Sequence, residues 1–308
     1  MAYRGVMARL EVTPVVAADA AEVATLLAAV ELALYGHTTF SQADLEEEWA
    51  DADLARDGRA VRDGGRLLGY AMITRRTDYW RVHGNVHPDA LGRGVGTLIA
   101  TGAERDAAAS GVRRLQNSVF EADGAGRTLI QALGYVPVRV FREMRIQLTT
   151  APAAPEWPDG LHVGAFDAVR DGRAFHAAHQ EAFADHWEHS SRDYASWSRV
   201  HLETPRFEPA LWCMVRAGDE IAGGAICTGD TYGGGWIDVL FTRRPWRGQG
   251  VGGALLQDAF SRLWDRGERT IGLGVDAGSD TGAFRVYERA GMTPTLAWVI
   301  HEKALDPS

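Results

Sequence analysis

A glycine-rich turn follows an apolar segment in the second half of the sequence. Residues 236–242 are suited to a strand, and residues 243–253 carry the chain into an apolar helical pattern. Closely spaced glycines let a ligand approach the backbone, and the unpaired N–H groups of a helix start attract anions. The turn therefore predicts a phosphate site, although a tight strand-to-helix turn without a ligand would use the same residues.

Two familiar phosphate-binding patterns fit this turn poorly. Gly248, Gly250 and Gly253 satisfy the dinucleotide-binding spacing, but Asp276 follows the first of them by 28 residues, whereas that pattern places its acidic residue about 20 residues on. A nucleoside-triphosphate loop requires lysine and then serine or threonine where Ala254 and Leu255 stand. Both alternatives are disfavoured.

The turn belongs to an internal repeat. Residues 91–96 and 247–252 recur at an offset of 156. Three further pairs of segments follow the same order: 63–71 with 217–225, 111–119 with 267–275, and 133–135 with 290–292. A proline-rich segment, residues 149–158, has the composition of a linker between the copies. The repeat predicts two domains, residues 1–150 and 151–308.

Each copy has the same predicted order of elements. A strand (11–16; 161–165) precedes helical segments (20–34 and 43–51; 173–183 and 194–201), followed by a strand hairpin and a fourth strand. The glycine turn, a helix, a fifth strand, a helix and a final strand complete the copy. This order predicts a mixed α/β fold of the α+β type, built twice.

Composition limits the function classes. The chain has 308 residues and a net charge of -9, which disfavours sequence-independent binding of nucleic acid. The start lacks an apolar run of signal-peptide length, and no stretch of 18 apolar residues follows. We therefore expect a cytoplasmic protein that acts without a membrane, with Cys213 and Cys227 as buried free thiols.

A second motif accompanies the glycine turn and completes a known pattern. The first part is Arg247, Gly250 and Gly252; the second part is Asp280, Ala283, Tyr287, Glu288 and Gly291. Together they resemble the acetyl-CoA signature of the GNAT superfamily of N-acetyltransferases, with Asp280 and Met292 in place of the usual Asn and Phe. The resemblance covers nearly the whole chain as two tandem domains, each a mostly antiparallel sheet flanked by helices.

The resemblance implies an activity and a cosubstrate. It implies transfer of an acetyl group from acetyl-CoA, by direct attack, to a primary amine of a small molecule or peptide. We expect no metal, and a monomer or homodimer. The cosubstrate residues that it implies are Leu240, Phe241 and Thr242 for the pantetheine arm, Arg247, Gly248, Gln249, Gly250, Val251, Gly252 and Gly253 for the pyrophosphate, and Asp280 and Ala283.

Two side chains are candidates for proton transfer. Tyr287 is the implied acid for the departing thiolate; without the motif it would be taken for a core aromatic on its helix. Asp238, nine residues before Arg247, is a candidate water-mediated base, and strand alternation places it on the same face as Trp236. It could equally be an ordinary polar strand residue or a helix-capping partner.

The acceptor in GNAT proteins lies beside the segment that links the first two helices. Asp185, His186, Trp187 and Glu188 fall there and offer charge and an aromatic face to a cation. Nearby histidines also raise the possibility of a metal site. They are His176, His179, His186, His189 and His201. They lack cysteine or carboxylate partners at ligand spacing, so we expect hydrogen-bonded or solvated histidines.

The N-terminal copy keeps the turn but not the chemistry. Arg93, Gly94, Val95, Gly96 and Thr97 form a second possible CoA site. Ile130 and Val82 stand where the second copy has Tyr287 and Asp238, so we expect a degenerate, catalytically silent domain. A function from another class, a non-catalytic acyl-CoA-binding regulator, is disfavoured by the acid and base candidates of the second copy.

Overall fold

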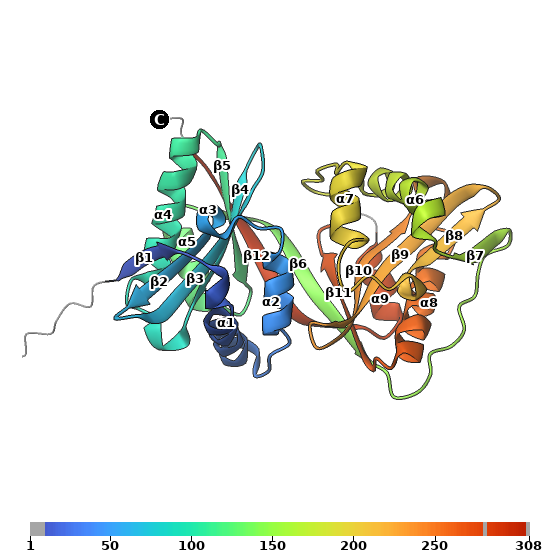
Figure 1. Cartoon of the computed structure of the whole chain (residues 1–308), viewed down its shortest axis with the longest axis horizontal. Helices are drawn as coiled ribbons and strands as arrows, with labels where there is room; N and C mark the ends of the chain where they lie inside the picture. Colours follow the sequence, from blue (N-terminus) through green and yellow to red (C-terminus); the bar gives the residue numbers. More distant parts are fainter. Residues whose placement is uncertain (1–9, 280–281, 306–308) are drawn as a thin grey trace, which may run out of the picture. The chain divides into compact units, whose positions relative to one another are not determined.

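The computed structural model describes residues 10–279 and 282–305. The chain divides into two compact units (Figure 1). Unit 1 comprises Met1–Phe141 with Leu296–Ser308, and unit 2 comprises Arg142–Thr295. Each unit is a mixed sheet with helices on both faces, which confirms the predicted fold class.

Unit 1 is built on a sheet of strand order β1-β2-β3-β4-β5-β12. These strands are β1 (Glu11–Pro14), β2 (Gly58–Asp63), β3 (Arg66–Arg75), β4 (Trp80–Val86), β5 (Arg114–Phe120) and β12 (Thr293–Ala304). Its helices are α1 (Ala20–Tyr35), α2 (Gln42–Trp49), α3 (Leu54–Asp57), α4 (Val95–Ser110) and α5 (Gly124–Ala132). Residues of α1 and α2 pack on one face, and residues of α4 and α5 pack on the other.

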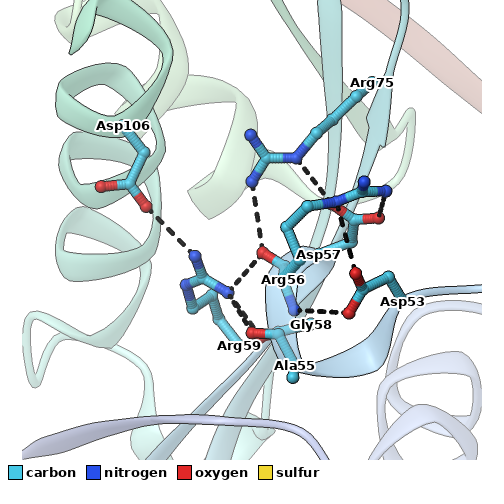
Figure 2. Close-up of polar contacts among 8 residues, drawn as sticks. All are labelled: Asp53, Ala55, Arg56, Asp57, Gly58, Arg59, Arg75 and Asp106. Carbon is cyan, nitrogen blue, oxygen red and sulfur yellow. Dashed lines mark hydrogen bonds and ion pairs between the residues drawn. The ribbon is translucent and has the colours of Figure 1, made fainter. Parts of the chain in front are cut away.

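A cluster of arginines and aspartates fixes α3 within unit 1. Asp57 is buried and accepts hydrogen bonds from Arg56 (2.9 Å) and from Arg75 of β3 (2.6 Å), as Figure 2 shows. Arg59 reaches Asp106 of α4 at 3.3 Å. Burial alone would raise the pKa of Asp57, but the hydrogen bonds from the two arginines hold it below its ordinary value. The carboxylate has cationic partners on both sides, so the cluster has a structural role.

Unit 2 is built on a sheet of strand order β6-β11-β10-β9-β8-β7. These strands are β6 (Val136–Gln147), β7 (Leu161–Ala165), β8 (Cys213–Ala217), β9 (Glu220–Thr231), β10 (Gly234–Thr242) and β11 (Thr270–Asp276). Its helices are α6 (Ala168–Phe183), α7 (Tyr194–His201), α8 (Val251–Arg266) and α9 (Ala283–Arg289).

Two apolar clusters cover the two faces of this sheet. The α8/α9 cluster joins Leu255 and Tyr287 to Ile237, Leu273 and Met144. The α6/α7 cluster lies on the opposite face and contains Phe175, Trp197, Trp212, Val239 and Phe241. These clusters give the sheet two distinct sides.

The last strand of each repeat extends into the unit of the other repeat. Strand β12 pairs with β5 in antiparallel register, from Trp298 opposite Phe120 to Ala304 opposite Arg114. Strand β6 lies beside β11, and the amide of Leu148 donates to the carbonyl of Arg269 at 2.7 Å. Residues 142–150 therefore lie in unit 2 and residues 296–305 in unit 1, an exchange that a sequence boundary near residue 150 does not include.

Candidate active site

The glycine turn of unit 2 has the backbone expected of an anion site. Gly248 and Gly250 have φ values of 74° and 88°, and Gly250 is the N-cap of α8. No described side chain caps this helix start. Because the first amides of a helix have no intrahelical acceptor, an uncapped start offers donors and the positive end of the helix dipole to a phosphate.

Arg247 fixes the turn through backbone carbonyls. Its Nε donates to the carbonyl of Thr242 at 3.1 Å and its Nη2 to the carbonyl of Ala182 at 2.8 Å. The first contact reaches the end of β10 and the second the end of α6. The side chain therefore holds the turn against two elements.

Strands β10 and β11 separate beside this turn. They pair in parallel from Gly235 opposite Ile271 to Ile237 opposite Leu273, and no described pair follows. Leu240, Phe241 and Thr242 continue to pair with β9 on their other side. Their edge toward β11 is thus without a strand partner among the described residues, and we call this place the β10/β11 opening.

A β-bulge lies at the start of the opening. Ile237 is opposite Cys227 and Val239 is opposite Ile226, so Asp238 is the additional residue. Ile237 packs in the α8/α9 cluster and Val239 in the α6/α7 cluster, which means that simple alternation of faces fails here. Asp238 is exposed and accepts a hydrogen bond from the Thr228 hydroxyl at 3.0 Å.

Tyr287 lies on the α8/α9 side of the sheet. It is 7% exposed, and burial raises its pKa to about 12. Ala283 begins the same helix and packs against the same cluster. The phenol therefore stays protonated at neutral pH, as an acid must. Asp280, which the sequence pattern assigns to the cosubstrate, lies outside the described residues.

Comparison with known proteins decides the family. Residues 25–135 and 173–292 match the acetyltransferase (GNAT) family. The chain belongs to the GNAT family. It is an N-acetyltransferase, and acetyltransferases of this family use acetyl-CoA. The two matched segments confirm the tandem arrangement that the repeat predicts.

Relatives of this GNAT chain are similar along most of its length. The mycothiol acetyltransferase of Thermobispora bispora is 33% identical over 255 residues, 78% of this chain and 81% of the relative. That of Streptomyces scabiei is 34% identical and covers 74% of this chain and 73% of the relative.

Solved structures give the same result. A GCN5-related N-acetyltransferase from Sphaerobacter thermophilus aligns with a TM-score of 0.85 and 32% identity over 97% of this chain and 96% of its own. A tandem GNAT protein from the clavulanic acid biosynthesis pathway, 18% identical with a TM-score of 0.75, covers 97% of this chain and 100% of its own and shares the fold.

The segment after α6 contains the four residues that the sequence analysis expects beside the acceptor, residues 185–188. Asp185 accepts a hydrogen bond from Arg244 at 2.9 Å and lies 3.9 Å from Arg247, and the bond from Arg244 lowers its pKa. His186 is half-buried against Phe183, with ring centroids 4.2 Å apart. Burial lowers the pKa of His186, and its most important opposing charge is Asp276 at the end of β11. Asp185 is thus joined to the glycine turn.

The remaining histidines of the α6/α7 layer take part in packing and hydrogen bonds. His179 accepts from the Trp197 indole at 3.1 Å and stacks on Phe241, and the His176 ring contacts the carbonyl of Arg192 at 2.7 Å. No group of three metal-ligating side chains occurs within residues 10–279 and 282–305. In the same ranges no helix is long and apolar enough to cross a membrane.

Sequence reasoning assigned no role to two residues near the opening. Trp236, whose ring lies over Gly272, and Arg145, delivered by the exchanged strand β6, belong to no family motif. The closest available signal was the alternation of Glu143, Met144 and Arg145, which predicts two polar side chains on one face of a strand. That signal does not say which sheet receives the strand.

The glycine turn of the N-terminal GNAT unit keeps its shape. Gly92 and Gly94 have φ values of 74° and 83°, and Gly94 is the uncapped N-cap of α4. Arg93 is paired with Asp63 at 2.6 Å, and Val95 is buried. Ile130 is buried among the residues of α4, α5 and their sheet face, so an apolar side chain occupies the position of the acid.

We predict that Gly250→Ala raises the Kd of acetyl-CoA at least about tenfold. A left-handed φ costs an L-residue roughly 1–2 kcal/mol, and the added Cβ would enter the open space in which we expect the phosphate to lie. Gly267→Ala is the matched control, because Gly267 has a φ of 113° at the other end of α8 and the same open surroundings. Calorimetric titration measures the Kd of acetyl-CoA for both variants. An equal increase in the two Kd values would mean that the phosphate binds elsewhere.

We predict that acid destabilises unit 2 through His179 and His201. Burial lowers their pKa values from 6.5 to about 3 and about 4, so the folded state favours neutral rings. This contribution is complete above pH 6.5 and falls as the pH drops toward 4, because only the unfolded chain gains protons there. The Tm should be lower at pH 5 than at pH 7.5. In a variant carrying His179→Gln and His201→Gln, the Tm should depend less on pH. An unchanged dependence of the Tm on pH would show that these two rings do not cause the acid destabilisation.

Proposed function

We propose that unit 2 transfers an acetyl group from acetyl-CoA directly to a primary amine. The observation that supports this most is that the β10/β11 opening adjoins the turn to the uncapped start of α8, while the phenol of Tyr287 is buried in the cluster that also contains Ile237 and Leu273, the last pair before the opening. An acetyl-CoA molecule bound along the opening would have its pyrophosphate at the start of α8 and its thioester sulfur near Tyr287.

The cosubstrate contacts follow the strand and the turn. The backbone of Leu240, Phe241 and Thr242 would pair with the pantetheine arm as a neighbouring strand does, because this edge faces the opening. The amides from Arg247 to Gly253 would hold the pyrophosphate, and Ala283 would lie beside the arm at the start of α9. Asp280 belongs to the same proposal.

The reaction needs two proton transfers. The amine nitrogen attacks the thioester carbon, the new C–N bond forms, and the C–S bond breaks with its electron pair on sulfur. Tyr287 gives its proton to that sulfur and regains one from solvent. Asp238, exposed at the bulge, takes the proton of the amine through a water molecule.

The acceptor would approach from the α6/α7 side. Asp185, His186, Trp187 and Glu188 form the proposed wall there. Because Asp185 is held by Arg244, its contribution would be to keep the wall against the glycine turn. His186 and Glu188 would supply the polar contacts, and Trp187 the aromatic face.

A mycothiol acetyltransferase is the second candidate. The tandem layout is similar to that enzyme, and the curated relatives of that name align with about three-quarters of this chain. The acceptor would then be a cysteinyl-glucosaminyl-inositol. Acetylation of this one compound, well above that of simpler amines, would establish the narrower function.

Incubation of the protein with acetyl-CoA and a panel of amines, aminoglycosides and peptides tests the main proposal. Release of free thiol that requires both protein and amine is the expected result. Binding of acetyl-CoA without thiol release from any member of the panel, the cysteinyl-glucosaminyl-inositol included, would favour an acyl-CoA-binding regulator instead.

The N-terminal unit is proposed to be catalytically silent while retaining a CoA site at Arg93, Gly94, Val95, Gly96 and Thr97. Its turn keeps the uncapped helix start, but Ile130 has no proton to give. A chain carrying Tyr287→Phe and Arg247→Ala should lose transfer to the true acceptor. Substantial residual activity that is then abolished by a change at Gly94 would assign chemistry to this unit.

A further inference from the structure

Strand β6 brings a charged pair to the α6/α7 side of the unit 2 sheet. Met144 packs in the α8/α9 cluster, so its neighbours Glu143 and Arg145 face the other way. A Cβ built on Gly272 would lie 2.4 Å from the Trp236 ring and 3.5 Å from Cγ of Arg145. Both side chains therefore cover the face of Gly272 that is opposite to Tyr287.

The guanidinium of Arg145 has an unused donor. Arg145 is 8% exposed; its Nε donates to Glu143 at 2.6 Å, and its carbon Cζ lies 5.5 Å from the Trp236 ring centroid. Its buried Nη2 has no hydrogen-bond partner among the described residues. Buried polar atoms are nearly always satisfied, and a buried donor without an acceptor is costly. An unsatisfied guanidinium nitrogen in a ligand-binding region thus indicates a ligand atom.

The position of Arg145 relates this donor to the reacting centre. Trp236 and Gly272 are opposite each other one residue before the pair at which β10 and β11 stop pairing. One residue of strand is about 3.3 Å. The side chain of Arg145 therefore reaches over β11 about one residue before the β10/β11 opening, on the side from which the acceptor would approach.

The net charge of the Glu143–Arg145 pair indicates what kind of ligand atom can accept from Nη2. Glu143 is 5% exposed and accepts from Arg145 and from the Thr295 hydroxyl at 2.8 Å. The carboxylate already neutralises the guanidinium, so a second buried anion would lack a cation of its own. An uncharged carbonyl or hydroxyl oxygen can accept from Nη2 without that penalty.

We propose that Arg145 is a positioning residue for the acceptor, donating from Nη2 to an uncharged oxygen on a carbon next to the one that bears the amine. The proposal depends on the proposed function of unit 2. It names the acceptor class as amines with an adjacent carbonyl or hydroxyl group, and it gives the exchanged strand a part in substrate selection.

Two near-isosteric amines test the proposal in the full-length protein. L-Alaninamide carries the oxygen, whereas 3-methylbutan-2-amine has a methyl group there. At saturating acetyl-CoA, kcat/KM is measured for each amine. It is calculated from the concentration of the unprotonated amine. The wild type should prefer L-alaninamide about 10- to 100-fold, the value expected for a charge-assisted hydrogen bond. Arg145→Met combined with Glu143→Gln should reduce this ratio to within about threefold.

The paired substitution avoids leaving Glu143 buried without a cation, and Arg105→Met is the control. Arg105 has an 80% exposed side chain in unit 1, so its removal should preserve the wild-type ratio. A ratio that is unchanged in the double variant, or absent in the wild type, would overturn the role of Arg145. Thiol release with neither amine, nor with any other, would contradict the proposed function instead.

A binding measurement separates these failures. L-Alaninamide is titrated calorimetrically into protein saturated with CoA, which cannot react. The double variant should bind at least about tenfold more weakly than the wild type or Arg105→Met. Equal affinity in all three proteins, or no binding to the wild type, would overturn the inference whether or not any amine is acetylated.

Discussion

Tyr287→Phe is expected to lower kcat on the true acceptor by at least about 10²-fold, with little change in the Kd of acetyl-CoA. Phenylalanine keeps the ring in the α8/α9 cluster but has no proton for the leaving sulfur. Since burial raises the pKa of Tyr287 to about 12, the wild-type activity should show no loss from phenol ionisation up to pH 10. Steady-state rates, with calorimetry for acetyl-CoA, measure the two effects.

Tyr135→Phe is the matched control for this substitution. Tyr135 is also a buried phenol, but it belongs to unit 1. Its substitution should leave kcat within about twofold of the wild type, because a phenol outside the reacting centre makes no contact with the transition state. If Tyr287→Phe and Tyr135→Phe have equal rates while single-turnover measurements show that chemistry limits turnover, Tyr287 is only a core residue.

Separation of the chain at residue 150 is expected to abolish both folding and activity of the second half. A fragment of residues 151–308 lacks β6, so β11 loses the neighbour that bonds to it through Leu148, and the α8/α9 cluster loses Met144. Loss of a fully buried methionine side chain alone costs about 2–5 kcal/mol, a large part of the 5–15 kcal/mol that stabilises a typical domain. Circular dichroism and thiol release measure the outcome.

Co-expression of residues 1–150 with residues 151–308 is the control. The two fragments together contain every exchanged strand, so they should form a 1:1 complex with activity near that of the intact chain. A folded, fully active fragment of residues 151–308 on its own would show that β6 is dispensable and that each repeat can complete its own sheet.

The family motifs and the repeat predicted much of this fold because they depend on local backbone requirements. The glycine turn illustrates this: the sequence predicts a helix after the turn in each copy, and the structure begins these helices at Val95 and Val251. The left-handed conformations of Gly94 and Gly250 end the turn earlier than a count of glycines suggests. Pyrophosphate-binding geometry is set within a few residues, so a single sequence can indicate it.

Features that depend on pairing between distant segments could not be predicted. The bulge at Asp238 is set by register with β9, and alternation along β10 gives the wrong face for the residues after it. The exchange of β6 and β12 is equally invisible, because a strand of given pattern fits either of two similar sheets. Arg145 was missed for that reason: its role depends on the unit that receives its strand.

The pairing of β12 with β5 also has a consequence during synthesis. Arg114 of β5 bonds to Glu302 of β12, 188 residues later in the chain. Unit 1 leaves the ribosome first, but its sheet can be completed only after β12 has been translated. Until then β5 has an unpaired edge. Contacts between residues so far apart in the sequence slow folding. A nascent chain stalled before residue 293 should consequently require holding by chaperones, although most of its first unit has already emerged.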